Sequence, residues 1–418
     1  MRFIHTADIH LDSPLTGLSG YQDAPAALLR TATRDAFENL VSEAISEKVD
    51  FMVIAGDLYD GNWKDFNTGI FFARQMGRLK TAGIPVYLLF GNHDAESEMT
   101  KKLSMPDNVH SFRSGKAETF KLPELRVALH GRSFKEAATT ENLAVGYPEP
   151  TTGWLNIGVL HTALEGHALH PNYAPCSIAE LEARGYQYWA LGHVHEHRVW
   201  HGKSIVAFPG NLQGRHIREP GPRGALMVTA EGSDIVSVER LHVDVLRWYA
   251  VDVDVSTATD LVGSVRLIGR ALEELLGDTE GDLPLAVRIK LFGASMAHGH
   301  LFGLESQLRG EVLAQATAIS AERLWVEKVR VETTPHDLAS QVAARSDAVA
   351  DLQVLLGKAG TDTAFLQSLH DDLMQLVGKL PLEIISALPD LEAIRAGNVQ
   401  DLVHKTSPSL VAHVAKAG

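Results

Sequence analysis

Seven side chains of the kinds that bind metal ions recur at short spacings in the first half of the chain. They are Asp8, His10, Asp57, Asn92, His161, His193 and His195. Residues i and i+2 of an extended segment point the same way. Asp8 with His10, and His193 with His195, can therefore each bind one ion from two sides. The set offers carboxylate, amide and imidazole donors. It is too large for one ordinary ion but suits two ions that share a bridging carboxylate.

Each group of these residues follows a short apolar run that predicts a β-strand. The runs are Phe3 to Thr6, Phe51 to Ala55, Val86 to Phe90, Ile157 to Leu160 and Tyr188 to Leu191. In open α/β sheets the carboxyl ends of strands border one crevice, so five loops can deliver side chains to one point. A lone histidine at such a place is more often a hydrogen-bonded turn residue. Five equivalent positions favour a two-metal site instead.

Glycines at positions 56, 91 and 192 precede the ligands, and we expect them to relax the backbone where the chain leaves each strand. Apolar residues recur at helical spacing from Phe37 to Val49, which predicts a strand, helix, strand unit. Residues 1–245 are predicted to form an α/β domain. A small α+β domain is expected over 246–335, and a helical region over 336–418, with Asp362 as a helix N-cap.

Composition narrows the classes of protein. The chain has 418 residues, 45% of them hydrophobic, which is enough for two or three domains. A single cysteine, Cys176, excludes an internal disulfide framework and favours the cytoplasm. No apolar run approaches the roughly 20 residues that cross a bilayer, so we expect no membrane anchor or signal peptide. The net charge of −14 argues against a broadly basic nucleic-acid-binding surface.

The motifs DxH, GD, GNHD, H and GHVH occur in the order that is typical of the calcineurin-like metallophosphoesterases, and the chain resembles that superfamily over about residues 1–245. The resemblance implies a four-layer α/β/β/α sandwich. It also implies two metal ions and their ligands: Asp8, His10 and His195 for one, Asn92, His161 and His193 for the other, and Asp57 as the bridge.

The same resemblance places His93 close to the scissile phosphate, oriented by Asp94. Two neighbouring cations polarise the phosphoryl oxygens and lower the pKa of a bridging water, which creates a hydroxide nucleophile near neutral pH. His93 would stabilise the developing charge or protonate the leaving oxygen. Mixed nitrogen and oxygen ligands without thiolate favour manganese, iron or zinc, and the resemblance makes Mn²⁺ the first choice.

Within the superfamily the sequence is most similar to DNA repair nucleases of the SbcD type, particularly to bacterial YhaO-like proteins. The segments that carry this match are FIHTADIHLDSPL, VIAGDLYDG, GNHD and FPGNLQGRHIRE. The resemblance implies a DNA exo- or endonuclease with a capping domain, and a helical tail that docks on a coiled-coil ATPase of the SMC/Rad type. A homodimer is a further expectation. One departure is Asp60, which stands where some relatives have a second catalytic histidine, so exonuclease activity is left open.

Basic residues in the loops around the site would contact the DNA phosphates, with Arg215 and His216 as the expected substrate-facing pair. The other candidates are Arg113, Lys116, Arg132, Arg198, Arg218 and Arg223. A small-molecule phosphodiesterase or phosphatase remains the alternative, because the same ligands would hydrolyse nucleotides. The complete ligand set disfavours a non-catalytic scaffold. The helical tail would alternatively pack on its own chain.

Overall fold

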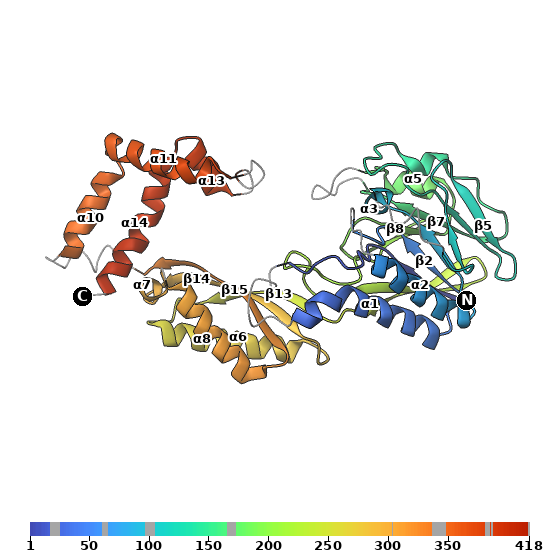
Figure 1. The fold of residues 1–418 in the computed structure, drawn as a ribbon, viewed down its shortest axis with the longest axis horizontal. Coiled ribbons are helices and arrows are strands. Elements are labelled where there is room, and N and C mark those ends of the chain that lie inside the picture. Colours follow the sequence, from blue (N-terminus) through green and yellow to red (C-terminus); the bar gives the residue numbers. More distant parts are fainter. Residues whose placement is uncertain are drawn as a thin grey trace. The chain divides into compact units, whose positions relative to one another are not determined.

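The computed structural model describes residues 1–16, 26–60, 66–96, 105–164, 173–302, 304–336, 348–380, 385 and 388–416. The chain forms two compact units (Figure 1). The first unit comprises residues 1–249 and 283–286, and the second comprises residues 250–282 and 287–418. None of the helices in these described ranges has the length and apolar character that a bilayer crossing requires.

The first unit contains two six-stranded sheets, and one of them has the strand order β12-β11-β1-β2-β3-β4. Strands β1 to β4 run parallel, and β11 is antiparallel to β1 and to β12. The carboxyl ends of β1, β2 and β3 therefore lie on the same edge. The strand bounds are β1 (Arg2–Thr6), β2 (Phe51–Ala55), β3 (Val86–Leu89), β4 (Val109–Ser111), β11 (Gly224–Glu231) and β12 (Asp234–His242).

The other sheet has the order β5-β6-β7-β8-β10-β9. Its inner strands β6, β7, β8 and β10 are parallel, and its edge strands β5 and β9 are antiparallel to their neighbours. The strand bounds are β5 (Glu118–Leu122), β6 (Val127–Gly131), β7 (Leu155–His161), β8 (Tyr188–Gly192), β9 (Arg198–His201) and β10 (Ile205–Phe208).

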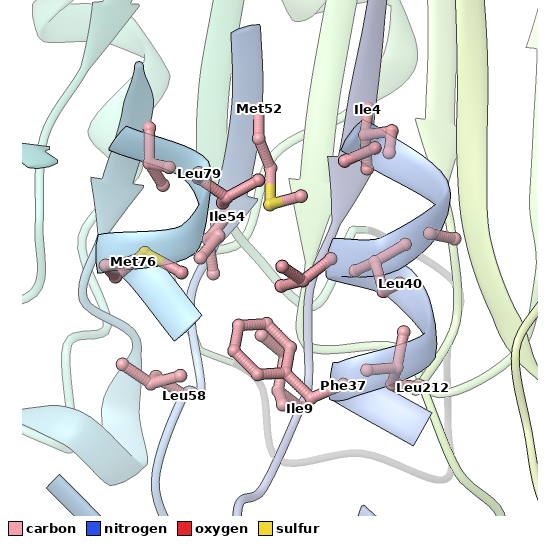
Figure 2. Close-up of a cluster of buried hydrophobic side chains, with 14 of the residues drawn as sticks. Ile4, Ile9, Phe37, Leu40, Met52, Ile54, Leu58, Met76, Leu79 and Leu212 are labelled. Carbon is pink, nitrogen blue, oxygen red and sulfur yellow. The ribbon is translucent and has the colours of Figure 1, made fainter. Parts of the chain in front are cut away.

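Helices α1 (Ala26–Ser46) and α2 (Phe66–Thr81) cover one face of the first sheet. Phe37 of α1 and Met76 of α2 are fully buried with Ile54 of β2, in the cluster that Figure 2 shows. Each large apolar side chain withdrawn from water contributes roughly 1.5–3 kcal/mol. The helical periodicity of α1 in the sequence therefore reports a real buried face.

The opposite face of the first sheet packs on the second sheet. Successive side chains of a strand alternate between faces, so Phe51 and Val53 of β2 point away from the helices. The Phe3 and Phe51 rings stack with centroids 4.8 Å apart, and the Tyr188 ring of the second sheet meets Phe3 edge-on at 5.6 Å. This interface is the apolar centre of the first unit.

The outer face of the second sheet is covered by the 3-10 helix η1 (Leu143–Gly146) and by α5 (Ile178–Ala183). Trp189 of β8 is buried there, and its indole nitrogen donates to the carbonyl of Leu181 in α5 at 3.0 Å. The layers are thus helices, sheet, sheet and helices. The predicted α/β/β/α sandwich is confirmed.

The second unit begins with an α+β region and ends in helices. A three-stranded sheet contains β13 (Arg247–Asp254), β14 (Leu285–Ser295) and β15 (Leu324–Pro335). Helices α6 (Leu261–Asp278) and α8 (Glu305–Ser320) pack against each other. Neither α8 nor the short α7 (His298–Leu301) is predicted from the sequence.

The C-terminal helices are α10 (Ala348–Ala359), α11 (Thr363–Val377), α13 (Pro389–Arg395) and α14 (Val399–Lys416). The side chain of Asp362 accepts two backbone N–H groups of α11, so the predicted N-cap is confirmed. α14 contacts α7 and β15, which shows that part of this tail packs on its own chain. The division of the chain into three domains remains a prediction.

Candidate metal centre

The seven predicted ligands lie at the carboxyl ends of strands from both sheets. β1, β2 and β3 belong to one sheet, and β7 and β8 belong to the other. The sheets pack face to face, so the crevice is bordered by two sheets instead of one open sheet. The positions by strand are Asp8 and His10 after β1, Asp57 after β2, Asn92 at the start of α3 (Asn92–Glu96) after β3, His161 at the end of β7, and His193 and His195 after β8.

One cluster of ligand atoms comes from Asp8, His10 and His195, whose donor atoms all lie within 4.8 Å of one another. The Nε2 atoms of the two imidazoles are only 3.2 Å apart. The backbone N–H of His193 donates to both carboxylate oxygens of Asp8 at 3.0 Å, which orients that carboxylate. We refer to these three ligands as the first cluster.

The second cluster comes from Asp57, His161 and His193, again with donor atoms within 4.8 Å of one another. His161 Nε2 lies 3.4 Å from Asp57 Oδ2 and 2.9 Å from the side-chain oxygen of Asn92. Its Nδ1 lies 3.0 Å from the carbonyl oxygen of Ala55. The structure thus brings Asn92 to the same point as the other ligands.

The donor set fits divalent metal ions. Two imidazole Nε2 atoms that face each other cannot both donate, and an ion would accept both lone pairs. The Nδ1 of His10, on the other side of its ring, lies 3.6 Å from Asp60 Oδ1. Nitrogen and oxygen donors without thiolate suit manganese, iron or zinc. The first cluster would hold one ion and the second cluster with Asn92 the other.

Four of the ligands have a positive φ angle, a backbone conformation that residues other than glycine rarely adopt. The φ angles are 50° at Asp8, 46° at His10, 52° at Asp57 and 103° at His193. Such positions cost on the order of 1–3 kcal/mol each and persist only where the surroundings enforce them. Here the backbone N–H of Asp8 donates to Gly56 and that of His10 donates to Asp57, at 3.0 and 3.1 Å. The loops after β1 and β2 therefore hold each other in the ligand-bearing shape.

The glycines before the ligands serve two different purposes. Gly56 has a φ of +101°, as expected for a backbone that turns sharply. A Cβ on Gly91 would lie 2.3 Å from Asp57 Oδ1, and one on Gly192 would lie 2.1 Å from the carbonyl oxygen of Ala55. Gly91 and Gly192 therefore provide room for close approach, which is not the conformational role that we expected.

Charge is concentrated in the second cluster. Burial favours the neutral form of Asp57, but the facing His161 imidazole outweighs it and holds the pKa of Asp57 below its usual range. Burial likewise opposes charge on His161, and the carboxylate of Asp57 nevertheless raises its pKa to about 9. In the first cluster, burial raises the pKa of Asp8 to about 6 and lowers that of His10 to about 3.

His93 lies at the rim of the two clusters. Its side chain is 40% exposed, and its ring centroid is 5.2 Å from that of His10. The backbone N–H of His93 donates to Asp57 Oδ1 at 3.1 Å, so a predicted ligand fixes the start of α3. His93 is therefore an accessible imidazole beside the metal ligands.

Asp94 and Asp60 occupy positions that the sequence did not reveal. Asp94 accepts the backbone N–H groups of Leu58, Tyr59 and Gly91 at 3.2, 2.9 and 3.0 Å, which ties the loops after β2 and β3 together. Asp60 Oδ1 lies 3.5 Å from the Nδ1 of His93 and 3.6 Å from that of His10. Asp60 thus places a carboxylate beside the His93 ring.

Arg215 lies beside a ligand of the first cluster, and its side chain is 15% exposed. Its Nη2 is 3.4 Å from His195 Nδ1, and its Nη1 donates to Ser13 Oγ at 3.2 Å. The ring of its neighbour His216 lies 3.8 Å from Glu219. Sequence reasoning missed Glu219, although it ends the stretch FPGNLQGRHIRE that follows the last ligand.

The remaining basic candidates are largely paired with acids or buried. Arg132 pairs with Glu141 at 3.0 Å, and Arg113 pairs with Glu118 at 3.8 Å. Arg223 is 5% exposed and donates to the side chain of Asn211 at 2.9 Å, so it supports a loop. The expected basic patch is therefore weaker than the sequence suggested.

Comparison with known proteins places the chain in a family. Residues 1–197 match the calcineurin-like phosphoesterases, and residues 248–334 match the middle domain of the metallophosphoesterase YhaO. The chain is 34% identical over 300 residues to the uncharacterized metallophosphoesterase YhaO of Bacillus subtilis, and the alignment covers 71% of this chain and 72% of that protein. This chain is a YhaO-like calcineurin-like metallophosphoesterase.

More distant relatives of this metallophosphoesterase are named DNA double-strand break repair protein Mre11. The protein of Sulfurisphaera tokodaii is 27% identical over 245 residues, which cover 56% of this chain and 62% of that protein. The protein of Aeropyrum pernix is 23% identical over 401 residues, which cover 83% of this chain and 93% of that protein. Family membership and the two ligand clusters together identify a dimetal phosphoester hydrolase.

Proposed function

We propose that this metallophosphoesterase is a two-metal DNA exo- or endonuclease of DNA repair. The observation that carries the proposal is the placement of two metal-ligand clusters beside a half-exposed imidazole, His93. The distant relation to Mre11 proteins supports DNA as the substrate. Two bound divalent ions, Mn²⁺ by preference and iron or zinc otherwise, would polarise the phosphodiester and supply activated water near neutral pH.

The side chains of this chain then have separate tasks. Asp57 belongs to the second cluster and also accepts the backbone N–H of His93, so it couples metal binding to the position of His93. His93 donates a proton to the leaving oxygen or a hydrogen bond to the developing charge. Asp60, 3.5 Å from its Nδ1, lies close enough to help orient the ring.

Arg215 and His216 are proposed to face the substrate. Arg215 brings a guanidinium next to His195, where a phosphate held by the ions would lie within reach of its donors. The partial exposure of both side chains supports this role. Phosphate contacts of this kind position a nucleic acid without reading its sequence.

A small phosphoester is the second candidate substrate. The net charge of −14 and the pairing of Arg113 and Arg132 with glutamates favour it, because both weaken attraction to a long polyanion. The same ligands and His93 would then hydrolyse a nucleotide-type diester or a monoester.

The C-terminal helices are proposed to dock on a coiled-coil ATPase of the SMC/Rad type. Apolar side chains on these helices are exposed, including Val354, Leu355, Phe365 and Leu376. Exposed apolar groups on helices are what a partner helix would bury. A homodimer through the same side chains is the other proposed assembly. The chain has a single cysteine, the buried Cys176, and such low cysteine usage supports a reducing cytoplasm as the cellular location.

The test compares substrates with the purified chain and Mn²⁺. End-labelled linear DNA is set against cyclic nucleotides and phosphomonoesters, with His93→Ala as the active-site variant. His201→Ala, at an exposed histidine of β9, is the matched control. Cleavage of DNA by the wild type and by His201→Ala but not by His93→Ala supports the nuclease. Hydrolysis of small esters alone replaces it with the second candidate, and DNA cleavage that persists unchanged in His93→Ala contradicts the role proposed for His93.

A further inference from the structure

Glu219 is a buried carboxylate on the outer side of the first cluster. Its side chain is 7% exposed, and Oε1 lies 2.8 Å from His195 Nδ1. Oε1 also accepts from Arg215 Nη2 at 3.3 Å, and His216 Nε2 lies 3.8 Å from it. Oε2 accepts the backbone N–H of Arg215 at 2.7 Å and the amide of Asn211 at 3.0 Å. The carboxylate is therefore held in one orientation by several donors.

These contacts determine where the proton of His195 resides. An ionised carboxylate only accepts hydrogen bonds, and a guanidinium only donates them. The Glu219 oxygen is closer to Nδ1 than Arg215 Nη2 is, at 2.8 against 3.4 Å. Nδ1 therefore carries the proton, and the lone pair of His195 lies on Nε2, which faces the Nε2 of His10 at 3.2 Å.

We propose that Glu219 is a positioning residue for the first metal site, which holds His195 in the Nδ1-protonated form so that Nε2 binds the ion. The proposal rests on the two-metal function proposed above. A carboxylate behind a ligating histidine fixes its tautomer and ring orientation, and loss of such a partner typically weakens metal binding about 10–100-fold.

In the second cluster, the outer ring nitrogen of His161 faces a main-chain carbonyl group instead of a carboxylate. His161 directs Nδ1 to the carbonyl oxygen of Ala55 at 3.0 Å, which is a main-chain group. A substitution of Glu219 should therefore weaken one ion and leave the other in place. This selectivity separates a positioning role from general loss of structure.

The variant that tests the role is Glu219→Gln, which keeps the size of the side chain and removes its charge. Glu327→Gln is the matched control, because Glu327 is also buried, at 4%, and forms a bidentate ion pair with Arg288 in the second unit. Mn²⁺ binding to the full chain is measured by calorimetry, and Co²⁺ absorption spectra report the nitrogen ligands. Thermal unfolding in EDTA shows whether each variant is folded.

We expect two ions in the wild type and in Glu327→Gln, and one ion bound about 10–100-fold more weakly in Glu219→Gln. Equal affinities of both ions in folded Glu219→Gln and in the wild type would overturn the proposal. Loss of both ions to the same extent would also overturn it, because the effect would then not be specific to the first site.

A measurement on the wild type does not depend on folding of the variant. Histidine-selective ¹⁵N spectra of the zinc-loaded chain, assigned with His195→Asn, should show His195 protonated on Nδ1. A proton on Nε2 would contradict the inference. If the wild type binds two ions with the expected asymmetry in Glu219→Gln but hydrolyses no phosphoester, the proposed function fails and the role of Glu219 stands. If the wild type binds no ion, both fail.

Discussion

The two ligand clusters use similar side chains but rest on different surroundings. In the second cluster His161 is fully buried, and its Nδ1 lies against the main-chain carbonyl of Ala55. In the first cluster His195 is 19% exposed and is backed by Glu219, while Asp60 lies beside His10. A histidine held by a main-chain carbonyl keeps its partner as long as the fold is intact. A histidine held by a side-chain carboxylate loses its partner when that one residue is replaced.

This difference indicates how each cluster responds to substitution. The second cluster contains Asp57, which contacts both His161 and the backbone of His93, so its loss should disturb the whole centre. The first cluster has acidic neighbours that can be changed one at a time. We therefore expect graded effects in the first cluster and all-or-none effects in the second.

The largest effect is expected from Asp57→Ala. The substitution removes a predicted bridging ligand and leaves the buried His161 without its counter-charge, so both ions and all hydrolysis should be lost. Metal content after gel filtration and ester hydrolysis are measured together. Asp252→Ala, at an exposed aspartate paired with Lys290, is the control. Retention of two ions in Asp57→Ala would break the distinction between the clusters.

His93→Gln should reduce the rate and leave metal binding intact. A group that transfers a proton in the transition state contributes about 10²–10⁴-fold, so we expect a fall of that order in kcat. The His93 side chain is half-exposed and belongs to neither cluster, which is why both ions should remain. An unchanged kcat would remove His93 from the chemistry, and a lost ion would make it a ligand.

Asp60→Asn is expected to have a smaller, mixed effect. The same oxygen lies 3.6 Å from His10 Nδ1 and 3.5 Å from His93 Nδ1, so both rings lose a neighbouring charge. Affinity for one ion and kcat should each fall by roughly tenfold, the lower end for an outer carboxylate. Calorimetry and steady-state kinetics separate the two. A change in kcat alone would show that Asp60 serves only His93.

His5 is a buried histidine that belongs to neither cluster. Its replacement should therefore change only the free energy of unfolding. Its ring contacts the Tyr188 hydroxyl and the Leu191 carbonyl, and burial lowers its pKa from 6.5 to about 3. Between these values the unfolded chain binds more protons, so His5 makes stability decrease as pH falls, by up to about 1.4 kcal/mol per pH unit.

Replacement of His5 by glutamine should remove its contribution to the pH dependence of the free energy of unfolding. Urea unfolding of the metal-free wild type and of His5→Gln between pH 7 and pH 5 measures the difference, because the free energy of unfolding falls linearly with urea concentration. Parallel pH dependence in the two proteins would mean that His5 does not become protonated on unfolding.

Much of the fold could be predicted from the sequence because its signals are local. Apolar runs located β1, β2, β3, β7 and β8, and helical spacing located α1, as the structure confirms. The polar residues directly after those runs are the ones that the structure gathers into two clusters. In the second unit α8 was missed, although Leu308, Val312 and Ala316 recur at helical spacing and are buried.

By itself, therefore, the sequence determined the strands, the candidate ligands and the family resemblance, because each depends on residues that are close together in the chain. Only the tertiary structure decided that two sheets border the crevice, that Asp60 lies beside His93 while Asp94 ties two loops, and that Glu219 backs His195. These contacts join separate loops, for example across 24 residues between His195 and Glu219. Their physical origin is the packing of the two sheets, which no local pattern encodes.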